Sequence, residues 1–426
     1  MKQALQPVVG PIQAKIHVPG SKSISNRALL LAALASGVSE INNIQVSDDI
    51  RAFVKALTDL GISIQLDEEA RKAVVGGCSG QFLNKHCVVW CGESGSLARF
   101  LLAACAGLSG AYYFDGAPSL RKRPMASLLQ ILTGQGLTCI PNDSERLPFT
   151  MISPNGLRGG KIFVDGSKTG QVVSALLMIA PFAKSPITLH VEKLVSRSYV
   201  GLTCSVMAEF GVHVEVLNEF EFTVSQPQHY VPRDYQVEPD LSTASYFFAA
   251  AAVTGGEVTM QAIRRPEIRQ GDVAFLSMLE KMGCVIEEGS AGLTVKGPRR
   301  LQGLEVSLKD CPDLLMTLAA IAPFAKSPTL ITDIGHARFK ESDRLQAMRM
   351  GLEVLGVRVE EGDTWLKIYP SEPHGGTINA YSDHRIAMAF AVMSLLVPNI
   401  VIEGAECVSK SCPEFFQLWK NLSLTP

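Results

Sequence analysis

The sequence has little net charge. Its 426 residues include 39 Lys and Arg against 41 Asp and Glu, a formal net charge of −2. Nucleic acids and anionic membrane surfaces select strongly basic proteins, so the overall charge indicates neither as a partner. Any affinity for an anion must therefore come from local clusters of basic side chains.

No hydrophobic run is long enough to cross a bilayer, which takes about 20 apolar residues. The longest apolar stretch, 386–402, is interrupted by Ser394, Pro398 and Asn399. The N-terminal segment MKQALQPVVG lacks the continuous apolar region and the small-residue cleavage site of a signal peptide. We therefore expect a cytoplasmic protein that does not contact a membrane.

Metal and cofactor motifs are also missing. The ten cysteines form no CxxC pair, which predicts reduced, mostly buried thiols without a disulfide framework or structural zinc. Of eight histidines, only His336 and His384 lie among clustered polar residues. GxGxxG, GxSxG and HExxH are absent, and GLRGGK at 156–161 is one residue short of a Walker A loop. We expect no metal and no cofactor.

What the sequence does contain is an internal repeat. Its 47% hydrophobic content is enough for more than one core. Five segments combine an amphipathic helix pattern, a glycine and a short alternating stretch; the glycines are Gly61, Gly136, Gly211, Gly283 and Gly356. Their separations of 75, 75, 72 and 73 residues predict repeated helix–glycine–strand units.

Each period also contains a second helix pattern that is apolar on nearly every face. The six segments are ALLLAALASG, ARFLLAACAGLSG, SALLMIAPFAKSP, ASYFFAAAAVTGG, MTLAAIAPFAKSP and IAMAFAVMSLLVP. A helix that is apolar all round is buried, so we expect six buried helices. The octet IAPFAKSP recurs at 179–186 and 321–328, two periods apart, which indicates internal duplication.

Six buried helices against five helix–glycine–strand elements leave the last unit truncated, ending in the helix pattern PEFFQLWKNL. The strand-like stretch ALQPVVGPIQAKIHVPG near the N-terminus has no helix of its own, and we expect it to complete that unit. Three units per domain then give one discontinuous domain, 1–20 plus 237–426, and a second domain, 21–236. The chain would cross between them twice.

Polar and basic residues gather where the six buried helices begin. The six starts read SKSISNR, ESGSLAR, SKTGQ, DLSTA, DCPD and SDHR. A helix N-terminus already favours an anion, and Lys22, Arg27, Arg99, Lys168 and Arg385 add positive charge there. An alternative is that Ser21, Ser23, Ser94, Ser167, Asp240 and Asp310 only cap helices while the basic side chains are solvated.

Further basic residues lie in LRKRP, ARFKESDR and VSKSCP. On a helix, Lys340, Glu341 and Arg344 would share one face, either as a salt-bridged surface or as part of a site. Taken together, the cations predict a site for more than one anionic group, with few acids kept to handle protons.

The succession of motifs resembles the 5-enolpyruvylshikimate-3-phosphate synthase family of enolpyruvyl transferases over essentially the whole chain. The motifs, in order, are PGSKSISNRALLLAALA, GESGSLAR, KRPM, VDGS with Gln171, LVSRSY, PD at 312–313, KESDRL, YSDHRIAMA and SK at 409–410. The resemblance implies an α/β, two-domain enolpyruvyl transferase-like fold, each domain with three repeated βαβαββ units around buried parallel helices. It also implies an active site in the cleft between the domains and a monomeric protein.

The resemblance further implies a reaction. The 5-hydroxyl of shikimate 3-phosphate attacks phosphoenolpyruvate, and the tetrahedral intermediate loses phosphate to give 5-enolpyruvylshikimate 3-phosphate. Matching positions assign catalysis to Lys22, Asp313 and Glu341, with Asp313 as base, alone or together with Lys22, and Glu341 as proton donor.

Matching positions also assign substrate contacts. Those for shikimate 3-phosphate are Lys22, Ser23, Arg27, Thr169, Gln171, Ser196, Asp313, His336 and Lys340. Those for phosphoenolpyruvate are Lys22, Gly95, Arg123, Gln171, Arg344, Arg385 and Lys410. Gly95 would let substrate approach a helix N-terminus closely, so glyphosate, a phosphonate analogue, should inhibit and Gly95→Ala should weaken that inhibition.

Four positions depart from the family's usual residues: Glu93 and His336 replace Asn, and Thr169-Gly170 replaces Ser-Ser. Nothing in the sequence explains an acid at Glu93 close to anions. Two alternatives remain, a UDP-N-acetylglucosamine enolpyruvyl transferase and a non-catalytic anion-binding relative. The first uses a cysteine where this chain has SLRKRP, and the second would not need Asp313 and Glu341.

Overall fold

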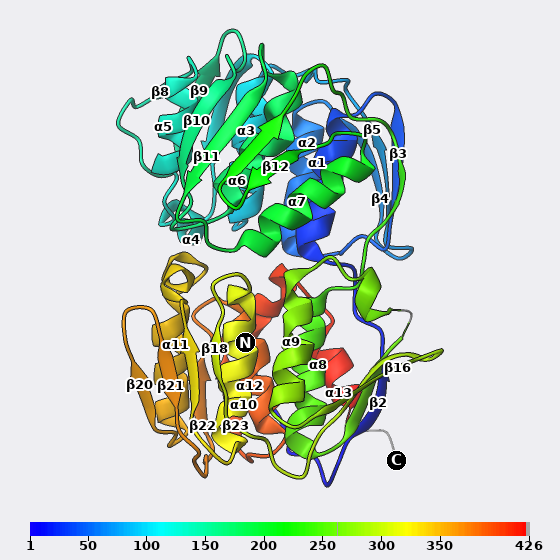
Figure 1. The fold of residues 1–426 in the computed structure, drawn as a ribbon, viewed down its shortest axis with the longest axis vertical. Helices are drawn as coiled ribbons and strands as arrows, with labels where there is room; N and C mark the ends of the chain where they lie inside the picture. The colour runs from blue at the N-terminus through cyan, green and yellow to red at the C-terminus, as the bar shows by residue number, and fades with distance from the viewer. Residues whose placement is uncertain (262, 423–426) are drawn as a thin grey trace. The chain divides into compact units, whose positions relative to one another are not determined.

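The chain folds into two compact units, each with its own hydrophobic core (Figure 1). The computed structural model describes residues 1–261 and 263–422. Unit 1 combines residues 1–19 with those from Pro239 onward, and unit 2 is Gly20–Glu238. The chain thus passes between the units after Pro19 and after Glu238, close to the expected crossings.

Unit 2 contains three four-stranded sheets of one design, in which two parallel strands are followed by two antiparallel ones. The first sheet has the order β14 (Asp234–Gln236), β3 (Val38–Asn42), β5 (Lys72–Gly76), β4 (Ser63–Asp67). The second has β6 (His86–Trp90), β7 (Gly110–Asp115), β9 (Phe149–Ser153), β8 (Thr138–Ile140). The third has β10 (Gly160–Asp165), β11 (Ile187–Glu192), β13 (Glu221–Val224), β12 (Glu215–Asn218).

Unit 1 contains two sheets of the same design and a third sheet that is shorter by one strand. One sheet has the order β16 (Val285–Gly289), β17 (Gly292–Lys296), β15 (Glu257–Met260), β2 (Gln13–Ile16). The next has β18 (Glu305–Ser307), β19 (Thr329–Thr332), β21 (Leu366–Ile368), β20 (Val359–Glu361). The last has only three strands, β1 (Lys2–Ala4), β23 (Ile400–Glu403) and β22 (Gly376–Asn379).

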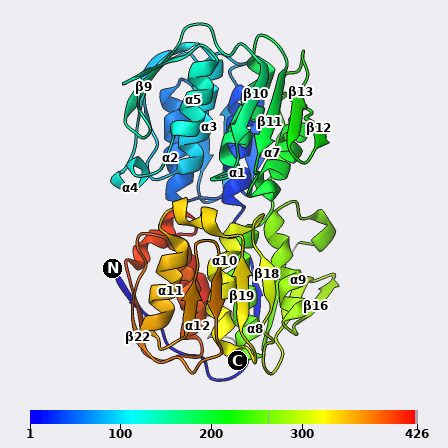
Figure 2. The same cartoon turned by 60° about the vertical axis from the view of Figure 1, so that its left-hand side comes forward.

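The six helices predicted to be buried are buried. They are α1 (Lys22–Leu34), α3 (Gly95–Gly107), α6 (Gln171–Ile179), α8 (Leu241–Thr254), α10 (Leu315–Ile321) and α12 (His384–Ser394). In unit 1, α8, α10 and α12 pack against one another inside the surrounding sheets (Figure 2). The helices with one buried face are α2 (Asp48–Asp59), α5 (Ala126–Gly134), α7 (Arg197–Glu209), α9 (Ala274–Lys281), α11 (Arg344–Val354) and the terminal α13 (Phe415–Asn421). The short α4 (Pro118–Arg121) and seven 3-10 turns complete the helices within the described ranges.

The repeat glycines end the partly buried helices as predicted. All five have positive φ angles, between 79° and 104°, a conformation that residues with a Cβ rarely adopt. Each is followed within a few residues by the predicted strand, namely β4, β8, β12, β16 and β20. The two-domain α/β fold of repeated βαβαββ units is therefore confirmed.

The prediction for the N-terminal stretch was wrong in part. Within residues 4–20, the strand Gln13–Ile16 pairs in parallel with β15, so it belongs to the first sheet of unit 1. The last sheet is completed by β1, which pairs with β23 through Lys2–Ala4 and only touches the beginning of that stretch. Strand alternation indicates which face is buried, but it does not say which distant partner the strand joins.

The two crossings exchange equivalent strands. In a regular repeat the first strand runs into the buried helix, yet β2 is followed by α1 of unit 2 and β14 is followed by α8 of unit 1. Each strand nevertheless pairs within its own unit, β2 with β15 and β14 with β3. Unit 2 is thus inserted between the first strand and the first helix of unit 1.

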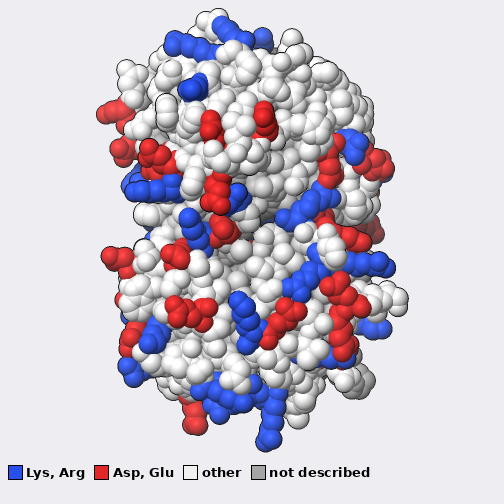
Figure 3. All heavy atoms as spheres, in the orientation of Figure 1, with Lys and Arg blue, Asp and Glu red and all other residues white. Residues whose placement is uncertain are grey.

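The surface and the helix lengths agree with the composition. Acidic and basic side chains are interspersed on the visible face of both units, without a single-sign field (Figure 3). Within residues 1–261 and 263–422, no helix is long and apolar enough to cross a membrane. All ten cysteines are free thiols, and six of them are buried.

Candidate functional site

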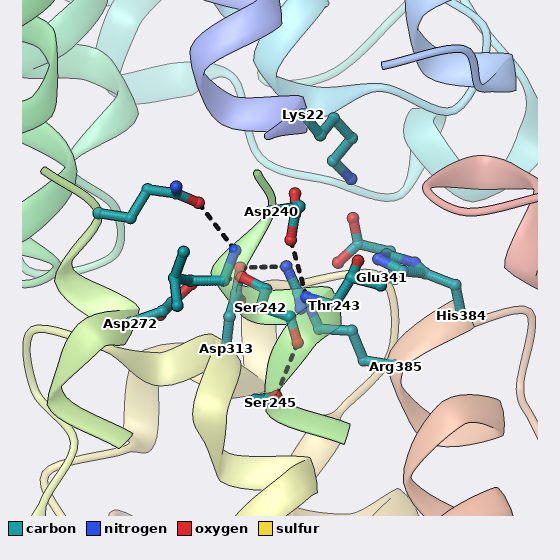
Figure 4. Close-up of polar contacts among 12 residues, drawn as sticks. Lys22, Asp240, Ser242, Thr243, Ser245, Asp272, Asp313, Glu341, His384 and Arg385 are labelled. Atoms are coloured by element: carbon teal, nitrogen blue, oxygen red, sulfur yellow. Dashed lines mark hydrogen bonds and ion pairs between the residues drawn. The ribbon is translucent and has the colours of Figure 1, made fainter. Parts of the chain in front are cut away.

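In unit 1 the predicted site residues gather around one buried guanidinium. Arg344, only 1% exposed, begins α11 and donates to three carboxylates. Its nitrogens lie 2.6 Å from Asp313, 2.9 Å from Glu341 and 2.9 Å from Asp383. Arg385, in the first turn of α12, donates to the other oxygen of Asp313 at 2.8 Å. Asp313 is thus held between two arginines. Figure 4 shows its contact with Arg385.

This arrangement sets the ionisation of its members. Burial raises the pKa of Asp313, but Arg385, Arg344 and Lys340 together lower it well below its usual range. Burial lowers the pKa of Arg344, but the three carboxylates raise it more. At neutral pH the cluster therefore holds an ionised Asp313, able to accept a hydrogen bond or a proton, beside fixed positive charge.

Residues 340–343 lie outside helix α11, which begins at Arg344. Lys340 follows the 3-10 turn Gly335–Phe339, and Asp343 caps α11 by accepting from the backbone of Gln346 at 3.1 Å. Glu341 and Arg344 still pair, but with side chains 14% and 2% exposed they form no solvent-exposed salt bridge. Of the two alternatives for KESDRL, the salt-bridged surface is therefore contradicted.

His336 and Lys410 are buried in the same unit, at 5% and 4% exposure. Burial, and then the charge of Lys340, lower the pKa of His336 to about 4, so its imidazole is neutral at pH 7. Its Nε2 has no hydrogen-bond partner among the described residues. A buried polar atom without a partner indicates a place where a ligand atom or water can bind.

In unit 2, the side chain of Arg27 is held by contacts with other residues of the same unit. It is 3% exposed, donates to the Thr203 hydroxyl at 2.7 Å and to the carbonyl of Ser23 at 2.8 Å, and lies over the ring of Phe100. Burial lowers its pKa to about 10, which still leaves the guanidinium charged at neutral pH. Arg27 thus provides a fixed positive charge beside Ser23.

A second group in unit 2 surrounds the start of α3. Arg99 donates to Gln171 at 2.7 Å and to the carbonyl of Pro124 at 2.8 Å, and Gln171 donates to the Ser96 hydroxyl at 3.0 Å. A Cβ on Gly95 would lie 2.9 Å from atoms of Arg123 and Arg99. The missing side chain at this position therefore leaves room for two guanidinium groups at the helix N-terminus.

The remaining predicted residues of unit 2 begin helices. Lys22 is the first residue of α1, and its Nζ lies 3.3 Å from Asp49. The hydroxyl of Thr169 accepts from the backbone of Gln171 at 3.2 Å, just before α6. Ser196 precedes α7 with a φ of 56°, and its buried hydroxyl has no hydrogen-bond partner within the described ranges.

The alternative of simple capping holds for two residues. Ser94 accepts from Leu97 at 3.4 Å and Asp240 from Thr243 at 2.8 Å. Solvated cations, the other half of that alternative, are contradicted at three positions, because Arg27, Arg99 and Arg385 are all buried. Lys168 is exposed, as the alternative of solvated basic side chains predicts.

Sequence reasoning overlooked Asp383 as a member of the site and did not predict the contact between Arg99 and Gln171. Asp383 caps α12 and joins Arg344, and Arg99 orients Gln171. Both residues stood in helix-start motifs, but their partners are 39 and 72 residues away in the chain. The exposed Glu93 accepts from the Ser119 hydroxyl at 2.9 Å.

Each unit therefore carries buried cations at helix starts, and unit 1 adds two carboxylates suited to proton transfer. Such sets bind phosphate and carboxylate groups and can stabilise charge that develops on them. In the part of the chain that the structure describes, no group of three or more His, Cys, Asp or Glu is placed to hold a metal ion.

The chain matches known proteins along nearly its whole length. A family model described as EPSP synthase (3-phosphoshikimate 1-carboxyvinyltransferase) matches residues 8–419. A 3-phosphoshikimate 1-carboxyvinyltransferase of Nostoc punctiforme is 44% identical over 408 residues, which is 95% of each chain. One of Vibrio campbellii is 40% identical over 425 residues, 98% of this chain and 99% of its own.

Solved structures with similar folds include an EPSP synthase and another enolpyruvyl transferase. An EPSP synthase from Acinetobacter baumannii gives a TM-score of 0.82 at 25% identity, covering 100% of this chain and 98% of that one. The enolpyruvyl transferase NikO from Streptomyces tendae gives 0.76 at 18% identity over 98% and 96% of the two chains, and this likeness concerns the fold alone.

Proposed function

This chain belongs to the EPSP synthase family, and we propose that residues of both its units together bind shikimate 3-phosphate and phosphoenolpyruvate and join them. The reaction transfers the enolpyruvyl group of phosphoenolpyruvate to the 5-hydroxyl of shikimate 3-phosphate and releases phosphate. It belongs to the shikimate pathway of aromatic amino-acid biosynthesis. Family membership also supports a cytoplasmic, monomeric enzyme as part of this proposal.

One observation supports the proposed chemistry most strongly. Buried Arg344 holds Asp313 and Glu341, the two proposed proton handlers, 2.6 and 2.9 Å from its guanidinium. The reaction needs a base for the 5-hydroxyl proton and an acid for the enolpyruvyl methylene, which afterwards loses a proton again. Asp313 is ionised and serves as the base, and Glu341 serves as the acid in the form in which its carboxyl group carries a proton.

The anionic groups of the substrates are assigned to the buried cations. In the proposal, Arg27, Ser196, Thr169, Ser23, His336 and Lys340 contact shikimate 3-phosphate. Arg123, Arg344, Arg385, Lys410 and the backbone at Gly95 contact phosphoenolpyruvate, while Lys22 and Gln171 contact both substrates. Neutral His336 can offer its unpartnered Nε2 to a hydroxyl of the substrate. Thr169 keeps the hydroxyl that the family's usual serine would supply.

The proposal places the substrates in a cleft to which both units contribute, because neither unit alone carries the full set of assigned residues. Closure on the substrates would exclude water, which strengthens each charge interaction and protects the tetrahedral intermediate. The positive charge beside Asp313 would stabilise the anion that forms as phosphate leaves.

Phosphate release tests the function. The protein should release phosphate when mixed with shikimate 3-phosphate and phosphoenolpyruvate, and not when UDP-N-acetylglucosamine replaces shikimate 3-phosphate. The reverse preference would support the alternative acceptor, and release with neither would support a non-catalytic relative.

Two substitutions test the assigned roles. Glu341→Ala should lower turnover by about 10²–10⁴-fold, the usual contribution of a general acid, and Lys22→Ala should also lower it by orders of magnitude. Lys55→Ala is the matched control in unit 2, because Lys55 is 73% exposed and pairs with Asp59 one helical turn away. Near-normal turnover in either site variant would remove that residue from the mechanism.

A further inference from the structure

A buried carboxyl group that has no assigned role lies near the Asp313–Arg385 pair. Asp272, 5% exposed, sits in the 3-10 turn Gly271–Val273 between β15 and α9. One of its oxygens accepts from the hydroxyl of Ser242 in the first turn of α8. The other, Oδ1, is buried and has no hydrogen-bond partner among the residues described. Figure 4 shows Asp272 beside Ser242 and Asp313.

The turn that carries Asp272 is tied to the segments around it. Gln270 accepts from the backbone of Leu241 at 3.1 Å and donates to the carbonyl of Pro239 at 2.8 Å. The thiol of Cys311 donates to the carbonyl of Gly271 at 3.3 Å, two residues before Asp313. Asp272 is therefore held in place relative to the segment of the proposed base.

The charges that face Asp272 come from each element packed against it. On α8 the N-cap Asp240 is acidic, on the 310–314 segment Asp313 is acidic and Cys311 is a thiol, and on α12 Arg385 is basic. The first turn of α9, AFLS, is uncharged. Burial first, and then the charge of Asp313, raise the pKa of Asp272 to about 7, although Arg385 lowers it. The charge of Arg385 thus acts on both carboxyl groups, while Asp313 is also paired with Arg344.

An anion that binds Arg385 would compete with both carboxylates. We propose that Asp272 is a positioning residue that takes up a proton from solution when phosphoenolpyruvate binds at Arg385, so that Asp313 remains ionised as the base. The inference rests on the proposed function, which assigns Arg385 to phosphoenolpyruvate. Protonation removes one negative charge from behind Arg385 and gives Asp272 a donor, while its ionised form leaves one buried oxygen without a partner.

The linkage has a definite sign. Above pH 7 Asp272 is ionised in the empty protein, so binding must be accompanied by proton uptake and must weaken as pH rises, by up to about tenfold per pH unit. Below pH 6 the carboxyl is already protonated, and binding should no longer take up a proton at this group.

Calorimetry of the whole protein with phosphoenolpyruvate alone tests the inference, because without shikimate 3-phosphate no reaction follows. Titration at pH 8 in two buffers of different ionisation enthalpy gives the protons taken up per ligand bound. Wild type should take up as much as one proton more than Asp272→Asn, and the variant should bind more tightly at this pH. Protonation of the ligand itself cancels in the comparison.

Ser242→Ala is the matched control. It removes the hydrogen bond to Asp272 but keeps the titrating carboxyl, so proton uptake should persist with its pH dependence displaced to higher pH. A purely structural role for the turn would instead weaken binding in both variants equally at every pH. Equal proton uptake by wild type and Asp272→Asn would overturn the inference.

Failure of the proposed function is distinguishable from failure of this inference. Phosphate release with both substrates tests the function separately, and a protein that binds phosphoenolpyruvate without turnover would contradict the function while the proton count still decides on Asp272. No binding of phosphoenolpyruvate would contradict both.

Discussion

At the scale of single residues, Arg344 joins three carboxylates of the site. Three carboxylates lie within 3 Å of its guanidinium, and it is almost fully buried. A buried charge network of this kind adds little net stability, but removing one partner leaves the others uncompensated. The cluster is therefore held together by Arg344 more than by any one acid.

Arg344→Ala should accordingly lower the free energy of unfolding by about 3–5 kcal/mol, measured by urea unfolding followed through tryptophan fluorescence. Arg349→Ala in the same helix is the control, since Arg349 pairs with Glu353 and Glu361 at 29% exposure and should cost no more than about 1 kcal/mol. Similar losses of unfolding free energy in the two variants would show that the buried network stabilises the protein no more than the partly exposed pairs of Arg349 do.

Gly95 is the glycine that lies against two arginines at the start of α3. An alanine methyl would lie 2.9 Å from the flexible ends of Arg123 and Arg99, so these side chains would have to move while the fold survives. Because Arg123 is assigned to phosphoenolpyruvate, we expect Gly95→Ala to raise the glyphosate concentration needed for half inhibition. Gly201→Ala, on a helix with open space around it, should leave inhibition as in wild type. Unchanged inhibition in Gly95→Ala would mean that this loop does not face the ligand.

At the scale of elements, the hydrophobic patterns were sufficient to predict the six buried helices and the five strands that follow the repeat glycines. These elements are decided by local periodicity and by the stop at each glycine. The helix start at Arg344 was missed, although Asp343 followed by Arg-Leu-Gln-Ala is an N-cap signal. Partners of side chains, such as Asp383 for Arg344, depend on which helices meet, and local patterns do not contain that information.

Helix α5 offers a direct test of the stop signal. Gly134 lies in the helix with open space around it, so Gly134→Ala should stabilise the protein by up to about 1 kcal/mol. Gly136, two residues later, has a φ of 104°, and Gly136→Ala should cost roughly 1–2 kcal/mol. Thermal unfolding of both variants measures this, and a stabilised Gly136→Ala would contradict the assigned role of the glycine.

At the scale of the whole molecule, the repeat period predicted the six units. It did not predict which sheet each N-terminal strand joins. β2 pairs with β15 across an insertion of more than 200 residues of chain, and β1 pairs with β23 at the other end of the sequence. Such pairings close long loops, so only the complete fold selects them. The family resemblance predicted the membership of the site, whereas the contacts within each unit came from the structure.

The central claim is that both units contribute residues to one active site. A crystal structure of the protein with shikimate 3-phosphate and glyphosate bound tests it most directly. We predict that the two ligands lie side by side and are contacted by Lys22 and Arg27 of unit 2 as well as by Asp313 and Arg385 of unit 1. Ligands contacted by residues of only one unit would contradict it.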